Sequence, residues 1–408
     1  MNGNELQKYA DMLVRVGANV QPGQELLLHV PVDIAPLARQ VVAAAYRAGA
    51  KFVMVDWQDQ AMKRVHLEEG PPEAAEVVDA GAIADMTKLL EGGGAVLALN
   101  APKPGMMKGV DSQRVMAQAK ANRGATKRLS ELMQTGQVAW SIATVPTPEW
   151  ARAVFPDLSQ EEAEAKLWES IRYVTRLDKE DPVAYWQGHV AQLNEKIDWL
   201  TDKQFTRLIF KSETADLTLD LPPNHKWVGG ALTGPQGQAF LPNLPTEEVF
   251  TAPLRTGVNG RVRATKPIFF NGEFVEGAEF VFRDGKVVEF KAKTGEEFLR
   301  KMMEMDEGAC YLGEVALVPQ DSPIANLGIL FQNTLLDENA SCHIALGSAY
   351  PLCVEKGAEM TPEQLMENGL NQSMLHTDFM IGSDDLNIDA ETADGERVAL
   401  FRNGNWAK

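Results

Sequence analysis

A histidine and an aspartate stand two positions apart in the strand-like segment LHTDFMIGS. Side chains two positions apart in a strand lie on the same face of the sheet. His376 and Asp378 could therefore reach one metal ion together. The carboxylate could equally do no more than orient the imidazole through a hydrogen bond, so this pair alone leaves both interpretations open.

Three further glutamates lie in strand-like segments. Glu314 falls inside the apolar run YLGEVALVPQDSP, where an ionised carboxylate is costly unless it is paired or bound to a metal. Alternation along GEVALV is imperfect, so Glu314 could also lie on a solvent-facing side. Glu247 and Glu248 follow one another in NLPTEEVFTAP, and in an extended segment only one of them can point inward.

A second histidine with chemical potential is His343, in CHIALGSAY. It stands seven residues before Tyr350 and just after DENAS, which offers Asp337 and Glu338. Cys342 is its neighbour, but adjacent residues of a strand point to opposite faces. We therefore interpret Cys342 as a buried structural cysteine and not as part of a thiolate–imidazole pair.

Other chemical motifs are missing from the sequence. The chain has three cysteines and no CxxC, so it encodes neither a disulfide framework nor a cysteine zinc finger. It has no GxGxxG, GxxxxGK[ST], GxSxG or HExxH motif. Four histidines lack neighbouring carboxylates in a ligand pattern, and we interpret them as core or surface residues: His29, His66, His189 and His225.

The elements that must position these residues differ between the two halves of the chain. In the first half, short apolar runs typical of strands buried on both faces alternate with helical patterns. The predicted strands are Glu25–Val30, Lys51–Trp57, Ala95–Asn100 and Gln137–Ala143. Such β-α-β alternation predicts an α/β, Rossmann-like domain with a mostly parallel sheet.

Two helices with strong start signals separate the halves. Ser159 and Glu162 form a capping box that opens a helix ending near Arg176. Asp181 followed by Pro182 predicts the start of the next helix, which extends to about Leu200. We place the domain boundary between these helices, with domains at 1–177 and 178–408.

The second half predicts an α+β domain with a mostly antiparallel sheet. The segments FTRLIFKS and ADLTLDLP alternate apolar and polar residues, as strands with one solvent-facing side do. Two-residue hairpin signals occur at Asn271-Gly272, Asp284-Gly285, Asp394-Gly395 and Asn403-Gly404. Capped helices are predicted at Thr294–Asp306, with Thr294 and Glu297 as a capping box, and at Pro362–Leu370 after Thr361.

Composition excludes several classes of protein. The 408 residues include 39 basic and 57 acidic side chains, a net charge of −18 that disfavours nucleic-acid binding. A hydrophobic content of 45% excludes wholesale disorder. No stretch approaches the roughly 20 apolar residues of a bilayer span, and the polar-rich first residues predict no signal peptide. We therefore expect a soluble, cytoplasmic protein without a membrane partner.

Four segments, taken in order, resemble the thermophilic aminopeptidase T and aminopeptidase S family of metallopeptidases: NLPTEEVFTAP, LGEVALVPQDSPI, NTLLDENASCHIALGSAYP and HTDFMIG. Their long intervals are those that the family shows, and the similarity in character covers essentially the full chain. The resemblance implies an α/β N-terminal domain, a C-terminal catalytic domain, and a homodimer that encloses the active sites in an internal space.

The resemblance also implies the site residues. Glu248, and not Glu247, is the glutamate that matches the family motif, and Glu314 is the carboxylate shared between two metal ions. The implied metal ligands are Glu248, Glu314, His343, Tyr350, His376 and Asp378. Glu338 in DENAS lies close to these ligands in the sequence, and it is our candidate either for the general base or for a residue that supports the ligands. Glu338, Glu314 and Tyr350 form the candidate catalytic set.

This ligand set suits a pair of divalent cations. Two such ions need several anionic oxygens and a bridging carboxylate that holds them about 3.5–4 Å apart. An oxygen-rich, sulfur-free set favours zinc, cobalt, manganese or magnesium over copper(I) or an iron–sulfur cluster. The implied reaction is release of the N-terminal amino acid from short peptides with a free N-terminus, by a metal-bridging water.

Two other interpretations remain open at this point. The same dinuclear site could hydrolyse another amide or an ester. Alternatively, the chain could be a non-enzymatic protein that binds a small molecule and holds its metal for structure alone. Structural zinc sites usually have four closed ligands, often cysteines, so six oxygen and nitrogen ligands argue against the second alternative.

Overall fold

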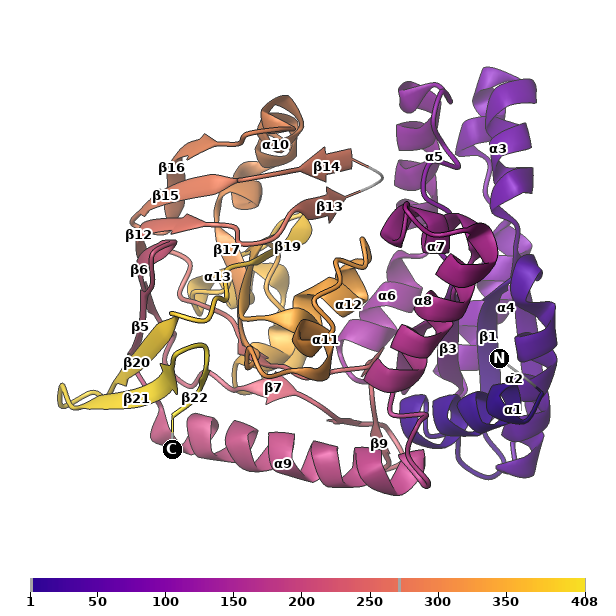
Figure 1. The fold of residues 1–408 in the computed structure, drawn as a ribbon, viewed down its shortest axis with the longest axis horizontal. Coiled ribbons are helices and arrows are strands. Elements are labelled where there is room, and N and C mark those ends of the chain that lie inside the picture. The colour runs from indigo at the N-terminus through magenta and orange to yellow at the C-terminus, as the bar shows by residue number, and fades with distance from the viewer. Residues whose placement is uncertain (1–2, 271–272, 408) are drawn as a thin grey trace. The chain divides into compact units, whose positions relative to one another are not determined.

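The computed structural model describes residues 3–270 and 273–407 of the chain (Figure 1). It contains two compact units. Unit 1 consists of Met1–Gly188 and Ala231–Leu244, and unit 2 consists of His189–Gly230 and Pro245–Lys408. The α/β and antiparallel regions that we expected are both present. The domain limits 1–177 and 178–408 stay a prediction.

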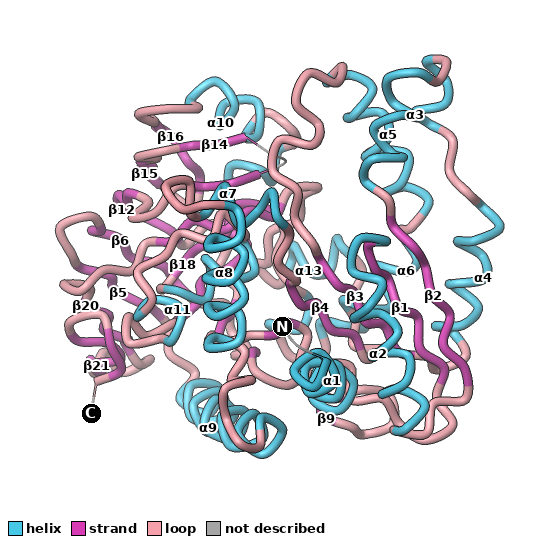
Figure 2. Tube along the Cα trace, turned by 45° about the vertical axis from the view of Figure 1, so that its right-hand side comes forward, coloured by secondary structure: helices cyan, strands magenta, loops and turns pink. Residues whose placement is uncertain are grey.

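Unit 1 contains a five-stranded parallel sheet in the order β10-β4-β3-β1-β2. Its strands are β1 (Glu25–Pro31), β2 (Phe52–Gln58), β3 (Ala95–Asn100), β4 (Trp140–Thr144) and β10 (Asn243–Leu244). Figure 2 shows the first four strands side by side. All four were predicted, although β4 begins three residues later than expected. Strand β10 was not predicted, because two residues carry no periodicity of their own.

Helices surround this sheet within unit 1. They are α1 (Gly3–Met12), α2 (Ala35–Arg47), α3 (Gln60–Glu69), α4 (Ala80–Glu91), α5 (Ser112–Ala125), α6 (Lys127–Gln134), α7 (Pro148–Val154) and α8 (Gln160–Val174). Helices α4 and α6 pack leucines against Leu27 of β1 and Val96 of β3. The capping box of Ser159 and Glu162 is present at the start of α8, as predicted. Short helical turns lie at Leu13–Gly17, Val32–Ile34 and Pro72–Glu76, and a small ladder joins β8 (Leu232–Thr233) to β9 (Ala239–Phe240).

Helix α9 (Pro182–Lys203) begins where the sequence predicted. The Asp181 side chain accepts a hydrogen bond from the Ala184 N–H, as an N-cap residue does. The residues of α9 belong partly to unit 1 and partly to unit 2.

Unit 2 is built on two antiparallel sheets. The larger has the order β16-β15-β12-β6-β5-β20-β21-β22, which can be followed down the left of Figure 1. Its strands are β5 (Arg207–Lys211), β6 (Ala215–Asp220), β12 (Val258–Arg263), β15 (Glu279–Arg283), β16 (Lys286–Lys291), β20 (Asn387–Glu391), β21 (Arg397–Arg402) and β22 (Asn405–Trp406). Buried and exposed residues alternate along β5 and β6, which confirms the predicted strands with one solvent-facing side.

The smaller sheet has the order β19-β18-β17-β11-β7. Its strands are β7 (Val228–Gly229), β11 (Val249–Thr251), β17 (Leu312–Leu317), β18 (His343–Gly347) and β19 (His376–Met380). Val315 and Ile344 from this sheet share one hydrophobic core with Leu217 from the larger sheet. Alternate residues of β17, β18 and β19 therefore face away from that core. A separate ladder pairs β13 (Ile268–Phe270) with β14 (Glu273–Val275).

The helices of unit 2 are short. They are α10 (Glu296–Met303), α11 (Pro323–Asn326), α12 (Thr334–Asp337) and α13 (Pro362–Glu367), with single turns at Glu307–Cys310, Glu338–Ala340, Pro351–Cys353 and Gly357–Glu359. Thr361 caps α13 as predicted, and the structure shows that it does so in a capping box with Gln364. The helix ends at Glu367, and Gly369 follows in a left-handed conformation with a φ of +85°.

The predicted N-cap of α10 is wrong. Gly295, with a φ of +78°, precedes the helix without a side-chain cap. A Cβ at Gly295 would lie 2.5 Å from the Phe274 carbonyl oxygen, so the tight approach requires glycine there. The Thr294 hydroxyl bonds Glu276 instead of the helix.

The predicted hairpin dipeptides have different outcomes. Asp284-Gly285 and Asn403-Gly404 have positive φ at both residues and join consecutive antiparallel strands, as this turn type requires. Asp394-Gly395 lies in a longer connection between β20 and β21, where of the two only Gly395 has a positive φ. The predicted turn at Asn271-Gly272 lies outside the described residues.

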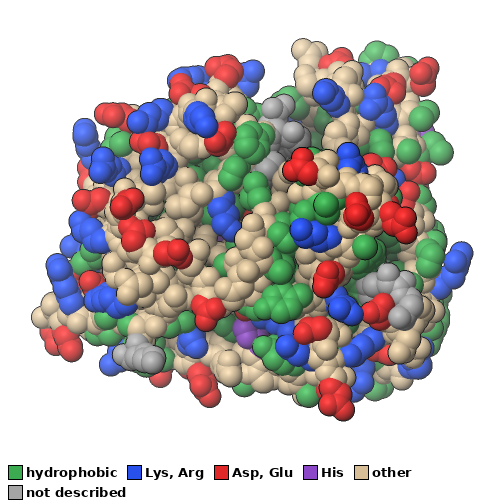
Figure 3. Space-filling model, in the orientation of Figure 1, with side chains coloured by type: hydrophobic (Ala, Val, Ile, Leu, Met, Phe, Trp, Pro, Cys, Tyr) green, Lys and Arg blue, Asp and Glu red, His purple; other side chains and the backbone are tan. Residues whose placement is uncertain are grey.

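The surface mixes the two signs of charge. Acidic and basic side chains are interspersed on the face drawn in Figure 3. Many form ion pairs within one element or between neighbours, such as Arg64 with Glu68 and Lys293 with Glu276. Over the described part of the chain, none of the helices combines the length and apolar character needed to cross a bilayer.

Candidate metal centre

Two groups of potential metal ligands overlap on the smaller sheet of unit 2. Glu248, Glu314 and His343 form one group, and Glu314, His376 and Asp378 form the other. Within each group, one atom from every residue lies within 4.8 Å of the others. Glu314 belongs to both groups. Five of the six residues implied as ligands by the resemblance are therefore brought together.

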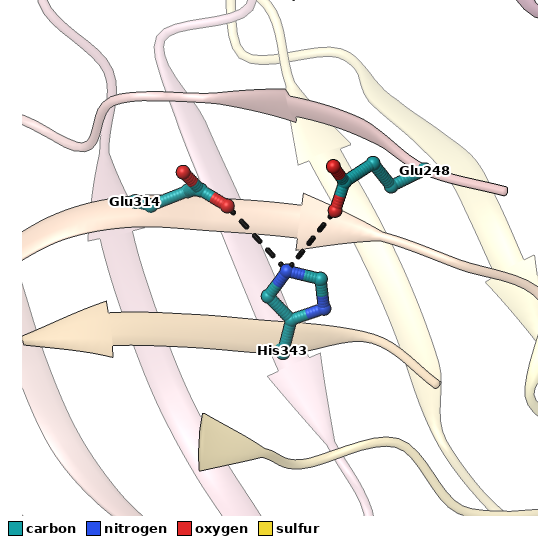
Figure 4. A group of neighbouring side chains, drawn as sticks. All are labelled: Glu248, Glu314 and His343. Atoms are coloured by element: carbon teal, nitrogen blue, oxygen red, sulfur yellow. Dashed lines mark ion pairs between the residues drawn. The ribbon is translucent and has the colours of Figure 1, made fainter. Parts of the chain in front are cut away.

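The first group is deeply buried. His343 Nε2 lies 3.2 Å from Glu248 Oε2 and 3.4 Å from Glu314 Oε1. Figure 4 shows both carboxylates turned toward this nitrogen. The His343 side chain is 1% exposed, and those of Glu248 and Glu314 are 9% and 6% exposed.

The second group is more open to solvent. His376 Nε2 lies 3.7 Å from Glu314 Oε2 and 3.6 Å from Asp378 Oδ1, and the His376 side chain is 28% exposed. The two oxygens of Glu314 therefore face different histidines: Oε1 faces His343 and Oε2 faces His376. A carboxylate in this position can contribute one oxygen to each of two neighbouring ions.

Both histidines are oriented by main-chain carbonyl groups. His343 Nδ1 lies 3.2 Å from the Ser341 carbonyl oxygen, and His376 Nδ1 lies 2.8 Å from that of Ser348. Because a carbonyl only accepts hydrogen bonds, each Nδ1 carries the proton. In the neutral ring, Nε2 then presents a lone pair toward carboxylate oxygens. That arrangement is repulsive unless a cation lies between them, and it is how metal-binding histidines are held.

An unpaired buried oxygen also fits a cation. Glu248 Oε2 receives no hydrogen bond from the described residues, although His343 Nε2 is 3.2 Å away. Leaving a buried carboxylate oxygen without a partner is costly. A positive ion between Glu248 and His343 would satisfy the oxygen and the nitrogen together, so the residues present fit a metal.

The strand register explains why the ligands share one face. Glu314 of β17 is opposite Ala345 of β18, which is opposite Asp378 of β19. In the same way His376 is opposite Gly347. Directly opposed residues of antiparallel strands project from the same face. The small residues between the ligands leave space above the sheet for the longer acidic side chains.

A β-bulge turns Glu314 toward this face. The pairing of β17 with β18 shifts between Leu312 and Glu314. Leu312 and Val315 both pack in the core, although they are three positions apart. The extra residue, Gly313, inverts the alternation, so that Glu314 leaves the core face and Val315 occupies it. This bulge is the physical reason for the imperfect alternation along GEVALV.

The remaining predicted residues lie in turns beside the sheet. Tyr350 follows β18, and its ring centroid is 5.3 Å from that of His376 and 5.7 Å from that of Phe250. Glu338 lies in the buried turn Glu338–Ala340 and is 9% exposed. Its charge interacts with Asp378, Glu248 and His343, which places it close to the two groups.

Burial and crowding shift the pKa values of these groups. Burial, followed by the charges of Asp378 and Glu248, holds the pKa of Glu338 well above 4.5. Burial also raises the pKa of Glu314, although its contact with His343 opposes that shift. For His343, burial lowers the pKa, but Glu248 and Glu314 outweigh it and leave the value well above 6.5. Without metal, these groups hold protons that offset the surplus of buried negative charge. Bound cations would take the place of those protons.

The tandem glutamates separate as an extended segment requires. Glu248 faces the first group, whereas Glu247 Oε2 lies 3.4 Å from His189 Nε2. Both carboxylates are buried, so Glu247 is a second buried acid and not a solvent-facing one. The interpretation of His189 as a core or surface residue stays a prediction, and the structure adds that a buried carboxylate, Glu247, is its partner. The partner lies 58 positions away in the sequence, so local pattern could not identify it.

Sequence reasoning missed two buried asparagines near the site. Asn339 accepts a hydrogen bond from the Glu247 N–H at 2.7 Å and donates to the Leu335 carbonyl. Asn371 bonds the chain on both sides of Ser348. Asparagine is usually a surface residue, so its type gave no signal. For Asn339, its position directly after Glu338 in DENAS was the available clue.

Comparisons with known proteins show which family the chain resembles along its length. The profile of a family described as thermophilic metalloprotease (M29) matches residues 2–406. Aminopeptidase 2 of Geobacillus stearothermophilus is 45% identical over 99% of this chain and 98% of its own length. Aminopeptidase T of Thermus thermophilus is 41% identical over 98% of both chains. The solved structure of wild-type AmpT from Thermus thermophilus has a TM-score of 0.93 with 40% identity and covers 99% of each chain.

Proposed function

The chain belongs to the thermophilic metalloprotease (M29) family, and on this premise we propose that it is a metal-dependent aminopeptidase that releases the N-terminal amino acid from short peptides. One observation carries the proposal: two groups of ligands meet at a single shared carboxylate, Glu314. A site built this way suits two neighbouring divalent ions, and a pair of ions is a recurrent device for hydrolysing peptide bonds.

We assign the two groups to two ions. The proposed ligands are Glu248, Glu314, His343, Tyr350, His376 and Asp378. Their oxygen and nitrogen atoms suit zinc, cobalt, manganese or magnesium. Burial and Glu314 raise the pKa of Tyr350 above 10 in the protein alone, so its phenol would need a nearby cation to ionise.

When bound, the ions would polarise the scissile carbonyl and lower the pKa of a bound water toward about 7. The protein's own groups supply the rest. Glu338 is the proposed general base, because it is a buried carboxylate that interacts with Asp378 and Glu248 of the two ligand groups, and burial raises its pKa. Its Oε1 lies 3.5 Å from Asn339 Nδ2. We assign Oε2 to accept the proton of the attacking water and to return it to the leaving amine.

The acidic ligands also bear on substrate choice. A free α-amine is cationic near neutral pH, and buried carboxylates favour a cation beside them. We further propose that the chain works in the cytoplasm as a homodimer, with unit 2 as the catalytic unit. An enclosed site would admit short, unfolded peptides and exclude folded proteins.

Hydrolysis of aminoacyl-anilides tests this function. We expect release of the anilide leaving group, loss of activity with a chelator, and recovery on adding zinc or cobalt. Metal analysis of the purified chain should give two ions per subunit. If a fully metal-loaded chain releases no free amino acid from any short peptide, the aminopeptidase function is wrong.

A further inference from the structure

The Ser348 carbonyl group holds His376 in place. His376 Nδ1 donates to it at 2.8 Å, and this bond directs Nε2 toward Glu314 and Asp378. Ser348 lies in the connection that leaves β18 at Gly347 and leads to Tyr350. A shift of this connection would therefore move two of the proposed ligands at once.

A buried asparagine holds the peptide groups on both sides of Ser348. Asn371 is fully buried. Its Nδ2 donates to the Gly347 carbonyl at 2.6 Å, and its own main-chain carbonyl accepts a hydrogen bond from the Ala349 N–H at 2.9 Å. The second hydrogen of Nδ2 bonds the Gly308 carbonyl at 2.8 Å. Asn371 thus clamps the residues immediately before and after the carbonyl that orients His376.

An arginine fixes the orientation of this amide. Arg255 Nε donates to Asn371 Oδ1 at 3.0 Å, so the oxygen faces the guanidinium and the nitrogen faces the two carbonyls. Arg255 is itself held in two ways. Its guanidinium carbon lies 3.8 Å from the centroid of the Tyr311 ring, and its Nη2 bonds Glu307 at 3.0 Å. The amide has a single arrangement that satisfies these neighbours.

The same connection is confined from the opposite strand. A Cβ built on Gly313 would lie 2.4 Å from both the Gly347 and the Ser348 carbonyl oxygens. Gly313 is the bulge residue that precedes Glu314. The Ser348 carbonyl therefore lies close against β17, while Asn371 bonds the residues that precede and follow Ser348 in the chain.

We propose that Asn371 is a positioning residue of the metal centre, which acts through Gly347 and Ala349 to hold the Ser348 carbonyl that orients His376 and the turn that carries Tyr350. This inference rests on the proposed function, because it requires that the centre bind metal. In the described contacts the Asn371 side chain bonds Arg255, Gly308 and Gly347 and none of the proposed ligands, so its effect is on ligand geometry.

The variant N371D tests the clamp. Aspartate keeps the size of the side chain and an oxygen for Arg255, but in place of the Nδ2 donor it presents an oxygen to two carbonyl groups. We expect the affinity for Co²⁺ to fall about 10–100-fold, as it does when an outer partner of a metal-binding histidine is lost. A titration of the full chain with Co²⁺ in a chelator buffer measures this. The visible spectrum of bound Co²⁺ should change, because ligand geometry changes.

A matched variant separates positioning from general destabilisation. Leu217 of β6 is fully buried in the core of unit 2 and makes no contact with the clamp in the described interactions. L217V should lower the melting temperature while keeping the Co²⁺ affinity within about twofold of wild type. The proposed positioning role of Asn371 is wrong if N371D binds Co²⁺ as tightly as wild type with an unchanged spectrum. It is also wrong if L217V weakens Co²⁺ binding as much as N371D does.

A second variant keeps the inference testable if N371D does not fold. R255K retains the positive charge but removes the Nε–H that fixes the amide, and should weaken Co²⁺ binding roughly three- to tenfold. E307Q leaves the bond between Arg255 and Asn371 intact and should stay near wild type. Equal Co²⁺ affinities in R255K and wild type would contradict the positioning role of Asn371.

The same titrations separate this inference from the proposed function. If wild type itself binds no Co²⁺ or Zn²⁺, the proposed function fails. If wild type and N371D both bind Co²⁺ tightly, only the positioning role of Asn371 is overturned.

Discussion

The two units each bring a histidine next to a carboxylate on a neighbouring strand, but they do so differently. In the parallel sheet of unit 1, His29 of β1 is directly opposite Asp56 of β2, with Nδ1 2.7 Å from Oδ2. In the antiparallel sheet of unit 2, His343 faces Glu248 and Glu314 through Nε2. His29 thus uses Nδ1 to contact a single carboxylate, whereas His343 directs Nε2 toward two carboxylates at once.

The environments of the two arrangements also differ. The His29 and Asp56 side chains are 30% and 22% exposed, and Asp56 has a second partner in Gln58. One carboxylate there faces one imidazole and an amide. In unit 2, three buried carboxylates, Glu248, Glu314 and Glu338, and the partly buried Asp378 lie around two imidazoles whose Nδ1 protons are already committed to carbonyls. The single carboxylate of the first arrangement is satisfied by hydrogen bonds from its neighbours, whereas the cluster of carboxylates in the second requires protons or cations.

The largest difference between the regions should appear on removing Glu314. E314Q keeps the shape of the side chain but loses the charge and one anionic ligand oxygen. We expect metal content and turnover to fall together by more than about a hundredfold, because a direct ligand matters more than an outer partner. Metal analysis and anilide hydrolysis measure both. E247Q, which alters the neighbouring buried acid that faces His189, should retain metal. Full activity with two ions in E314Q would contradict the assignment.

Loss of Glu338 should separate chemistry from metal binding. E338Q removes the proposed proton acceptor while preserving the shape of the turn. We expect kcat to fall about 10²–10⁴-fold with metal content unchanged. Steady-state kinetics on a metal-saturated chain, with metal analysis of the same sample, gives the answer. If the ions are lost in parallel with activity, Glu338 is a ligand and not the base.

The bulge in β17 offers a smaller effect. G313A places a methyl group against the Gly347 and Ser348 carbonyls, and this overpacking should cost about 1–3 kcal/mol of stability. Activity should fall roughly tenfold or more because the Ser348 carbonyl orients His376. The control is G124A in α5, where nothing lies within 4 Å of the new Cβ; it should be neutral or stabilising. Wild-type activity in G313A would show that the Ser348 connection tolerates displacement.

The smallest effect is expected in unit 1. The hydrogen bond from His29, together with that from Gln58, holds the pKa of Asp56 below its ordinary value of 3.8. A lowered carboxyl pKa stabilises the folded chain above 3.8, and this contribution is lost as pH falls below 3.8 through the folded-state value. D56N should therefore lower stability by less than about 1 kcal/mol at pH 7.

Denaturant unfolding of D56N and wild type at pH 7 and at pH 3 checks this prediction, since the difference between them should shrink at the lower pH. Metal content and anilide hydrolysis should be unchanged by D56N. A loss of metal in this variant would mean that the two histidine–carboxylate arrangements are not independent.

Much of the local structure could be predicted from short stretches of sequence. The apolar runs that became β1 and β3 and the capping box at Ser159 depend on residues within a few positions of one another. Prediction failed at Thr294, where an adjacent glycine adopts a left-handed conformation because the Phe274 backbone lies against it. That neighbour is distant enough in sequence to give no local signal. The strand β10 was missed because its two residues are too short a run to show a periodicity.

The sequence by itself determined which residue types could bind metal, and the two-residue spacing of His376 and Asp378 placed that pair on one face. Only the tertiary structure decided that Glu314 faces both histidines, that Glu247 faces His189, and that Asn371 bonds the Gly347 carbonyl next to Ser348. The physical reason is that strand register and bulges are set by burying the whole sheet against its core. Contacts between residues so far apart in the chain exist only once that register is formed.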